Sequence, residues 1–163
     1  MEMAEKISES QQKNLTEAGS RLLARCDLKK LIELLFVWDK ERNEALDHQN
    51  IINEARNFLT NDLVVGCFEN EMIVGIIAFS IVKITWKAEN IIYEGLTFVH
   101  PGYRGKGIMS KLLEQVEEIG KEKECKHIIM GSNFWGSNNP EVAKNVLLKN
   151  GYQLHGYLMR KGL

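Results

Sequence analysis

Glycine and basic residues alternate in the middle of the chain, between an apolar stretch and an amphipathic one. Residues 101–107 read Pro-Gly-Tyr-Arg-Gly-Lys-Gly, so Arg104 and Lys106 are interleaved with Gly105 and Gly107. A helix that starts after such a loop has unpaired N–H groups and partial positive charge at its first turn. Glycines remove the β-carbons that would keep an anion away from those amides. The spacing predicts a phosphate cradle, and the alternative is a glycine-rich turn that only joins two elements.

Two common nucleotide-binding loops do not fit this stretch. A Walker A loop needs GxxxxGK followed by Ser or Thr, and the sequence contains none. In the dinucleotide pattern GxGxxG, Gly105 and Gly107 would be the first two glycines, but Ser110 stands at the third position. That pattern also needs an acidic residue at the end of the next strand, where residues 131–133 read Gly-Ser-Asn. A Rossmann unit is therefore not predicted.

The residues on either side of the loop predict the elements that position it. The apolar, β-branched run over 91–99 predicts a strand. From Gly107 to about Lys123 the pattern predicts a helix. Its core face carries apolar residues at helical spacing, namely Ile108, Leu112, Leu113, Val116 and Ile119. The loop is thus expected at a strand–helix junction.

Helices and strands alternate over the rest of the chain, after a short apolar run at 21–25. The other predicted elements are helices over 28–38 and 48–59, strands over 63–68 and 72–84, a short buried strand over 127–131, a helix from Pro140 that stops at Gly151, and a closing strand over 152–160. Asp27 is the expected N-cap of the first helix. The order β-α-α-β-β-β-α-β-α-β predicts a mixed α/β (α+β) sheet protein.

Length and composition are those of an ordinary globular protein of one domain. The chain has 163 residues, 44% of them hydrophobic and 26% charged. We expect residues 1–19 to form a polar tail and residues 20–163 a single domain. A net charge of −1 without runs of like charge argues against a dedicated nucleic-acid or membrane-surface protein. No apolar run reaches the length of a membrane span.

Cysteines and histidines show no spacing typical of a metal site. Cys26, Cys67 and Cys125 are odd in number and widely separated, and the four histidines are scattered. The polar N-terminus lacks the pattern of a signal peptide. The sequence therefore predicts a cytoplasmic protein without a metal or a disulfide framework.

Residues 104–109, Arg-Gly-Lys-Gly-Ile-Met, resemble the signature of the GCN5-related N-acetyltransferases (GNAT), Arg/Gln-x-x-Gly-x-Gly/Ala. The approach over 98–103, Phe-Val-His-Pro-Gly-Tyr, is similar to that family as well. So is the stretch over 143–152, which resembles the pattern Ala-x-x-x-Tyr-x-x-x-Gly-Phe. The resemblance covers roughly residues 20–161. It implies the GNAT fold, a central mixed, mostly antiparallel sheet flanked by helices.

The resemblance implies an N-acetyltransferase that moves an acetyl group from acetyl-CoA to a primary amine by direct attack. The amine can belong to a small molecule, a peptide or a protein, and homodimers are common in the family. Phe98 and Val99 would supply backbone groups to the pantetheine arm and the thioester carbonyl. The pyrophosphate would be held, largely through amides, by Arg104, Gly105, Lys106, Gly107, Ile108, Met109 and Ser110. Asn139 stands one residue before a position where family members often have an asparagine near the pantetheine.

Glu94 is the candidate general base. It is the carboxylate inside the apolar strand over 91–99, four residues before Phe98, where some family members carry a glutamate. Partial burial would raise its pKa toward a range useful for taking a proton from an ammonium group. The alternative is a strand glutamate that faces solvent or pairs with a lysine. Candidate acids are Tyr93, Tyr152 and Tyr157, and Trp135 is a candidate wall of the acceptor site or a packing residue.

Two residues depart from the family pattern. Met109 stands where Gly or Ala is usual, and its side chain is expected to narrow the loop. Leu147 stands where many members have a tyrosine that protonates the leaving thiolate, so the acid stays unassigned. These departures motivate a second hypothesis, a CoA-binding sensor or interaction module without acetyl transfer. A third is modification of a nucleic acid or nucleotide amine, which the near-neutral charge argues against.

Overall fold

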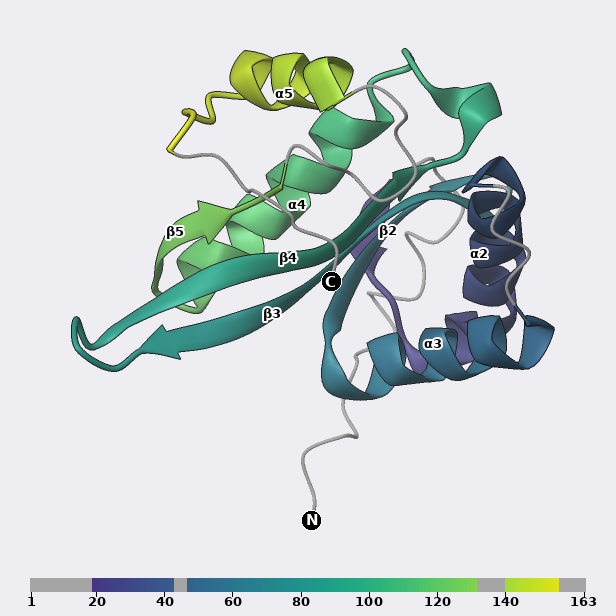
Figure 1. Ribbon diagram of the computed structural model, residues 1–163, viewed down its shortest axis with the longest axis horizontal. Helices are drawn as coiled ribbons and strands as arrows, with labels where there is room; N and C mark the ends of the chain where they lie inside the picture. The colour runs from purple at the N-terminus through teal and green to yellow at the C-terminus, as the bar shows by residue number, and fades with distance from the viewer. Residues whose placement is uncertain (1–18, 43–46, 132–139, 156–163) are drawn as a thin grey trace, which may run out of the picture.

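The computed structural model describes residues 19–42, 47–131 and 140–155, and a five-stranded sheet runs through its centre (Figure 1). The strands lie in chain order and are β1 (Ser20–Leu22), β2 (Leu63–Glu69), β3 (Met72–Ile84), β4 (Glu89–Val99) and β5 (Cys125–Ile129). Neighbours pair antiparallel except β4 and β5, which are parallel. The predicted mixed sheet is therefore confirmed.

Helices cover both faces of the sheet. The α-helices are α2 (Leu28–Arg42), α3 (His48–Asn61), α4 (Ile108–Glu122) and α5 (Pro140–Lys149), and two short 3-10 turns are η1 (Arg25–Asp27) and η2 (Pro101–Tyr103). Figure 1 shows α2 and α3 on one side of the strands and α4 and α5 on the other. Because β4 and β5 are parallel, the chain has to cross the sheet between them, and α4 makes that crossover.

Each face of the sheet has its own apolar core. One core joins α4 and Leu147 of α5 to the strands through residues that include Ile77, Phe79 and Ile92. The other joins α2 and α3 to the strands through residues that include Ile76, Leu96 and Phe98. Strands buried on both faces are apolar at successive positions rather than at alternate ones. This is why β2 and β3 read as nearly continuous apolar runs.

The predicted elements over 28–38, 48–59, 63–68, 72–84, 91–99 and 107–123 are present, with ends that differ by a few residues. The role of Asp27 was predicted wrongly. Its carboxylate does not cap α2 but accepts bonds from Arg21 and from the Ala24 N–H. The short strand predicted over 127–131 is β5 at Cys125–Ile129, and it is partly exposed rather than buried. Residues 152–155 are not in a strand, and the rest of the predicted closing strand lies outside the described residues.

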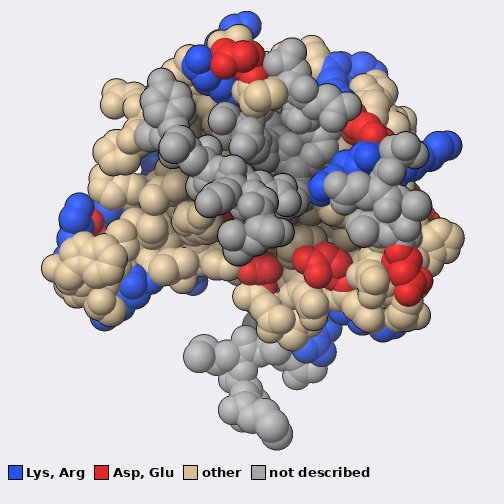
Figure 2. Space-filling view, in the orientation of Figure 1, with Lys and Arg blue, Asp and Glu red and all other residues tan. Residues whose placement is uncertain are grey.

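Charges of both signs are spread over the surface. Figure 2 shows Lys and Arg side chains interspersed with Asp and Glu over the described part of one face. Among the described residues, no helix is both long and apolar enough to cross a membrane. All three cysteines carry free thiols.

Candidate functional site

The loop predicted to bind phosphate connects β4 to α4. After β4 ends at Val99, the chain forms η2 and then the glycine loop, defined here as residues 104–107. Gly105 and Gly107 have φ values of 76° and 77°, and a Cβ at either position would meet no atom within 4 Å. Glycine is thus required by backbone conformation, not by crowding, and the space in front of both residues is open.

Gly107 is the N-cap of α4 and supplies no side chain to its first turn. The first helical bond runs from the Lys111 N–H to the Gly107 carbonyl at 3.2 Å. The N–H groups of residues 108–110 precede that bond, so they have no partner within the helix. With the positive end of the helix dipole, these amides can bind a phosphate at the open side of the loop.

A close contact fixes the start of α4 against the sheet. Gly75 of β3 pairs with Val99, the last residue of β4. A Cβ at Gly75 would lie 2.8 Å from Ile108 Cγ2 and 3.1 Å from Leu112 Cδ1. The missing side chain lets the first turns of α4 approach β3, so the helix N-terminus sits directly beside the end of β4.

The segment between β4 and the glycine loop is held by its own side chains. His100 Nδ1 accepts from the Gly102 N–H at 3.1 Å, and the His100 and Tyr103 rings pack edge to face. The Lys106 ammonium lies 4.7 Å from the centre of the Tyr103 ring. Lys106 therefore stays beside the loop, where its charge adds to that of the helix N-terminus.

β4 and β5 separate part-way along β4. Their parallel pairing ends with Tyr93 opposite Ile129, whereas β4 continues to Val99. From Glu94 to Val99, the edge of β4 that faces β5 has no strand beside it within the described residues. Backbone groups along such an edge can pair with an extended ligand, as a further strand would. The open edge ends at Val99, and η2 then leads to the glycine loop, so both features lie at the carboxyl end of β4.

Glu94 lies where the two strands separate. Its Oε2 accepts a 3.2 Å bond from the Gly131 N–H, just beyond β5, and its buried Oε1 has no partner among the described residues. Burial raises the pKa of the Glu94 carboxyl, while the neighbouring Thr97 hydroxyl and the Gly131 N–H oppose that rise. A carboxylate with a raised pKa and a free oxygen is suited to accept a proton. Glu94 is half-buried, and no lysine among the described residues pairs with it.

A β-bulge shifts the pairing register of β4 directly after Glu94. Phe79 is opposite Glu94 and Ala78 is opposite Leu96, so Gly95 is the extra residue on β4. Thr97 follows the bulge with 2% exposure, and its hydroxyl oxygen forms no hydrogen bond of good geometry with any described residue. Two polar side chains next to the open edge, half-buried Glu94 and buried Thr97, thus have spare hydrogen-bonding capacity among the described residues. Such groups are uncommon in folded proteins and point to a function.

The side chain of Arg104 was expected beside the phosphates, but in the structure it bonds to other parts of the protein. Its Nη1 and Nη2 each donate to a Glu41 oxygen at 2.7 Å, and its Nε donates to the Val99 carbonyl at 3.1 Å. The guanidinium therefore bonds α2 and the end of β4. The backbone of Arg104 still leads into the glycine loop.

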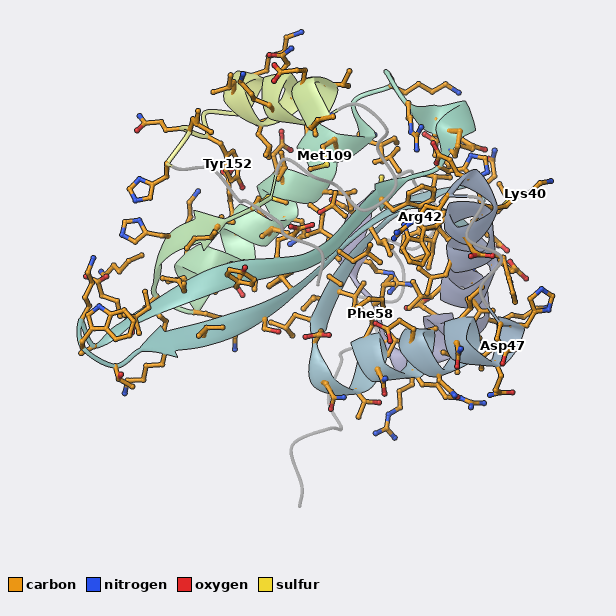
Figure 3. The ribbon with its side chains drawn as sticks, in the orientation of Figure 1. Lys40, Arg42, Asp47, Phe58, Met109 and Tyr152 are labelled. Atoms are coloured by element: carbon orange, nitrogen blue, oxygen red, sulfur yellow. The ribbon has the colours of Figure 1, made fainter. Side chains whose placement is uncertain are left out.

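Met109 and Leu147, the two departures from the family pattern, belong to the same apolar cluster. Leu147 is buried within it and Met109 packs against it. Figure 3 shows Met109 at the start of α4, on the opposite side of the sheet from Lys40 and Arg42 of α2. The Met109 side chain thus packs against the core, which does not favour the expected narrowing of the loop.

The candidate acids are far from equivalent. Tyr93 is 55% exposed at the end of the β4–β5 pairing. Tyr152 packs against the α4 core, and its hydroxyl is buried without a partner among the described residues. Burial, together with Glu117, raises the pKa of Tyr152, so it holds its proton. Tyr157, Trp135 and Asn139 lie outside the described residues.

The sequence reasoning did not single out Thr97, Gly75 or Glu41. A glycine inside a strand pattern, Gly95, was an available signal for the bulge that places Thr97. Glu41 lies 63 residues from Arg104 and gives no local signal. Among the described residues there is no group of three or more side chains suited to hold a metal ion.

Comparison with known proteins agrees with this geometry. Residues 25–141 match the family model described as acetyltransferase (GNAT) family. A 60-residue segment is 35% identical to thialysine N-epsilon-acetyltransferase of Bos taurus, covering 37% of this chain and 35% of that protein. The match thus spans about a third of that relative's length.

Solved structures share the fold over most of the chain. A ribosomal-protein-alanine N-acetyltransferase from Brucella melitensis biovar Abortus 2308 has a TM-score of 0.69 at 17% identity, covering 90% of this chain and 100% of that one. An aminoglycoside N-acetyltransferase solved in complex with CoA has a TM-score of 0.70 at 14% identity, covering 90% and 95%. At these identities the likeness concerns the fold alone. Because the family model covers most of the chain, the protein belongs to the GNAT acetyltransferase family.

Proposed function

We propose that this protein transfers an acetyl group from acetyl-CoA to a primary amine. The observation that carries the proposal is the separation of β4 from β5 beside the half-buried carboxylate of Glu94. The glycine loop and the N-terminus of α4 lie at the same end of the sheet. A thioester carried on a long phosphorylated arm fits this arrangement, with its phosphates at the helix and its arm along the open edge of β4.

The residues proposed to bind acetyl-CoA divide into two groups. The amides of Gly105, Lys106, Gly107, Ile108, Met109 and Ser110 would hold the pyrophosphate, with the Lys106 ammonium and the Ser110 hydroxyl beside them. The backbone of Phe98 and Val99 would pair with the arm. Asn139 stays a candidate contact from the sequence. The structural observations that support this fit are the left-handed glycines, the first-turn amides of α4 that have no partner within the helix, and the edge of β4 that has no neighbouring strand among the described residues.

Acetyl-CoA supplies an activated carbonyl, so the protein has to provide orientation and a proton acceptor. A primary amine is an ammonium ion near neutral pH and must lose a proton before it can attack. Glu94 is placed to take that proton, directly or through a water molecule. As the new C–N bond forms, the C–S bond breaks, and the thiolate that leaves is a good leaving group near neutral pH. This is compatible with Leu147 at the position where relatives carry a tyrosine.

The acceptor is proposed to be a primary amine on a small molecule. The names of the related proteins mention thialysine and aminoglycosides, and one mentions the alanine of a ribosomal protein. The test is incubation with acetyl-CoA and a panel of diamines, amino acids, aminoglycosides and peptides, followed by mass spectrometry. A product heavier by one acetyl group on an amine nitrogen supports the proposal. Absence of any acetylated product over the whole panel would argue for CoA binding without transfer.

A homodimer is the proposed assembly. The sheet face that carries Val82, Tyr93 and Ile129 extends beyond α3, and these side chains are 44%, 55% and 45% exposed. Trp86, at the end of the β3–β4 hairpin, is 83% exposed. Exposed apolar surface of this kind is typical of an interface. Light scattering that gives the mass of one chain would contradict the dimer.

The cytoplasmic location stays a prediction.

A further inference from the structure

We propose that Glu41 is a positioning residue for the phosphate loop, acting through the side chain of Arg104. Glu41 lies in the last turn of α2. Its two carboxylate oxygens accept hydrogen bonds from Nη1 and Nη2 of Arg104, each at 2.7 Å. The third directed bond of Arg104 goes to the Val99 carbonyl. One guanidinium thus ties together the end of α2, the end of β4 and the first residue of the glycine loop. The inference rests on the proposed binding of CoA at that loop.

The Arg104 guanidinium lies on the α2 side of the sheet. It sits 5.8 Å from the centre of the Phe98 ring, and Phe98 belongs to the core shared with α2 and α3. The start of α4 lies on the opposite side, where Ile108 belongs to the other core. Figure 1 shows the connection from β4 to α4 passing over the end of α2. The guanidinium is therefore directed away from the helix amides that are proposed to hold the phosphates.

Holding Arg104 has a direct consequence for the loop. Gly105 and Gly107 lack side chains, and a Cβ placed on either would touch nothing within 4 Å. Nothing at those two positions therefore packs the loop in place, and glycine has more conformational freedom to lose than any other residue. A bidentate ion pair next to the glycines limits that freedom before the ligand arrives. Glu41 would thus improve binding by preorganisation, without touching the ligand.

A competing interpretation predicts the opposite change in CoA affinity when Glu41 is replaced. If Glu41 withheld Arg104 from the phosphates, its removal would free a cation for the ligand and tighten binding. If Glu41 positions the loop, its removal weakens binding. The neutral variant Glu41→Gln, which keeps the size of the side chain, separates the two. Glu33→Gln is the matched control, since Glu33 is an exposed carboxylate about two turns earlier on α2.

The first measurement needs no ligand. Backbone order parameters from NMR relaxation should fall for residues 105–110 in Glu41→Gln, from about 0.85 toward 0.6, and should stay unchanged in the helices. Glu33→Gln should match the wild type. Equal order parameters for residues 105–110 in the wild type and Glu41→Gln would overturn the proposal, and so would a fall spread over the whole chain. This measurement decides the role of Glu41 even if the wild-type protein fails to bind CoA, which would refute the proposed function instead.

The second measurement is CoA affinity by calorimetry. Glu41→Gln should weaken the affinity about three- to tenfold, and Arg104→Ala should weaken it by a similar factor. The double variant should bind CoA no more weakly than Arg104→Ala, because both changes remove the same ion pair. Tighter or unchanged binding in Glu41→Gln, or losses that multiply in the double variant, would contradict the positioning role.

Discussion

The Gly131 N–H donates a 3.2 Å hydrogen bond to Glu94 Oε2, across the point at which β4 and β5 separate. The bond holds one carboxylate oxygen at the end of β5, and the other oxygen is buried with no partner in the part of the chain that the structure describes. Glu94 is therefore fixed in position and still able to accept a proton. The same carboxylate marks where the open edge of β4 begins.

Replacing Glu94 by glutamine is expected to slow acetyl transfer about 10²- to 10³-fold, because glutamine cannot take a proton from the amine. The affinity for CoA should change by less than about threefold, since the side chain lies outside the phosphate loop. Steady-state rates and calorimetry on the same samples check both parts. A variant with full activity would remove Glu94 from the mechanism.

The pH profile offers a finer test through Thr97. Glu94 acts when deprotonated, so the rate should fall as the pH drops through its raised pKa. The Thr97 hydroxyl opposes that rise, and Thr97→Val should therefore move the acidic limb of the kcat profile to higher pH. Valine has nearly the same shape and removes a hydroxyl that lacks a good hydrogen bond. An acidic limb that does not move would show that Thr97 has no influence on the base.

Glu94 should also reduce stability at neutral pH. A carboxyl whose pKa is raised by folding binds its proton more tightly in the folded than in the unfolded state. Stability therefore falls as the pH rises through the interval between the two pKa values. Glu94→Gln should raise the melting temperature at pH 7, and the gain should shrink at a pH below the carboxyl's ordinary pKa. A lower melting temperature at pH 7 would mean that the carboxylate is better satisfied than its contacts indicate.

Two of the left-handed glycines, Gly107 and Gly151, allow the effect on stability to be separated from the effect on binding. Both have positive φ, 77° and 84°, and a Cβ at either would touch nothing within 4 Å. Alanine at either position should cost about 1 kcal/mol of unfolding free energy. Only Gly107→Ala should weaken CoA binding, and Gly107→Glu should weaken it further by adding negative charge. Equal effects of Gly107→Ala and Gly151→Ala on affinity would refute the phosphate assignment.

The ion pair of Arg21 with Asp27 should contribute to stability in a pH-dependent way. Burial raises the pKa of Asp27, but the bonds from Arg21 and the Ala24 N–H outweigh it and hold the pKa below its ordinary value. This contribution is present above the unfolded pKa and is lost as the pH falls through the lowered one. Asp27→Ala should cost about 2 kcal/mol at pH 7 and less in acid, measured by urea unfolding. A cost that stays constant with pH would contradict this.

Local sequence signals predicted the glycine loop, the strand before it and the helix after it, because spacing and periodicity act over a few residues. Glu94 was identified for the same reason, as a charge inside an apolar strand. The partners of these residues were not predicted. Glu41 is distant from Arg104 in the sequence, and Gly131 is distant from Glu94, so only the tertiary fold brings each pair together. Asp27 was assigned as a cap because its position suits one, but Arg21 forms a stronger, charged pair with it.

The most direct test of the account is the amine-dependent release of CoA from saturating acetyl-CoA, measured side by side for the wild-type protein and Glu94→Gln. We expect release that rises with the concentration of a primary amine in the wild type and falls about 10²-fold or more in the variant, while both bind CoA. Tight CoA binding by the wild type, with no amine in a broad panel increasing the release, would contradict the proposed acetyl transfer.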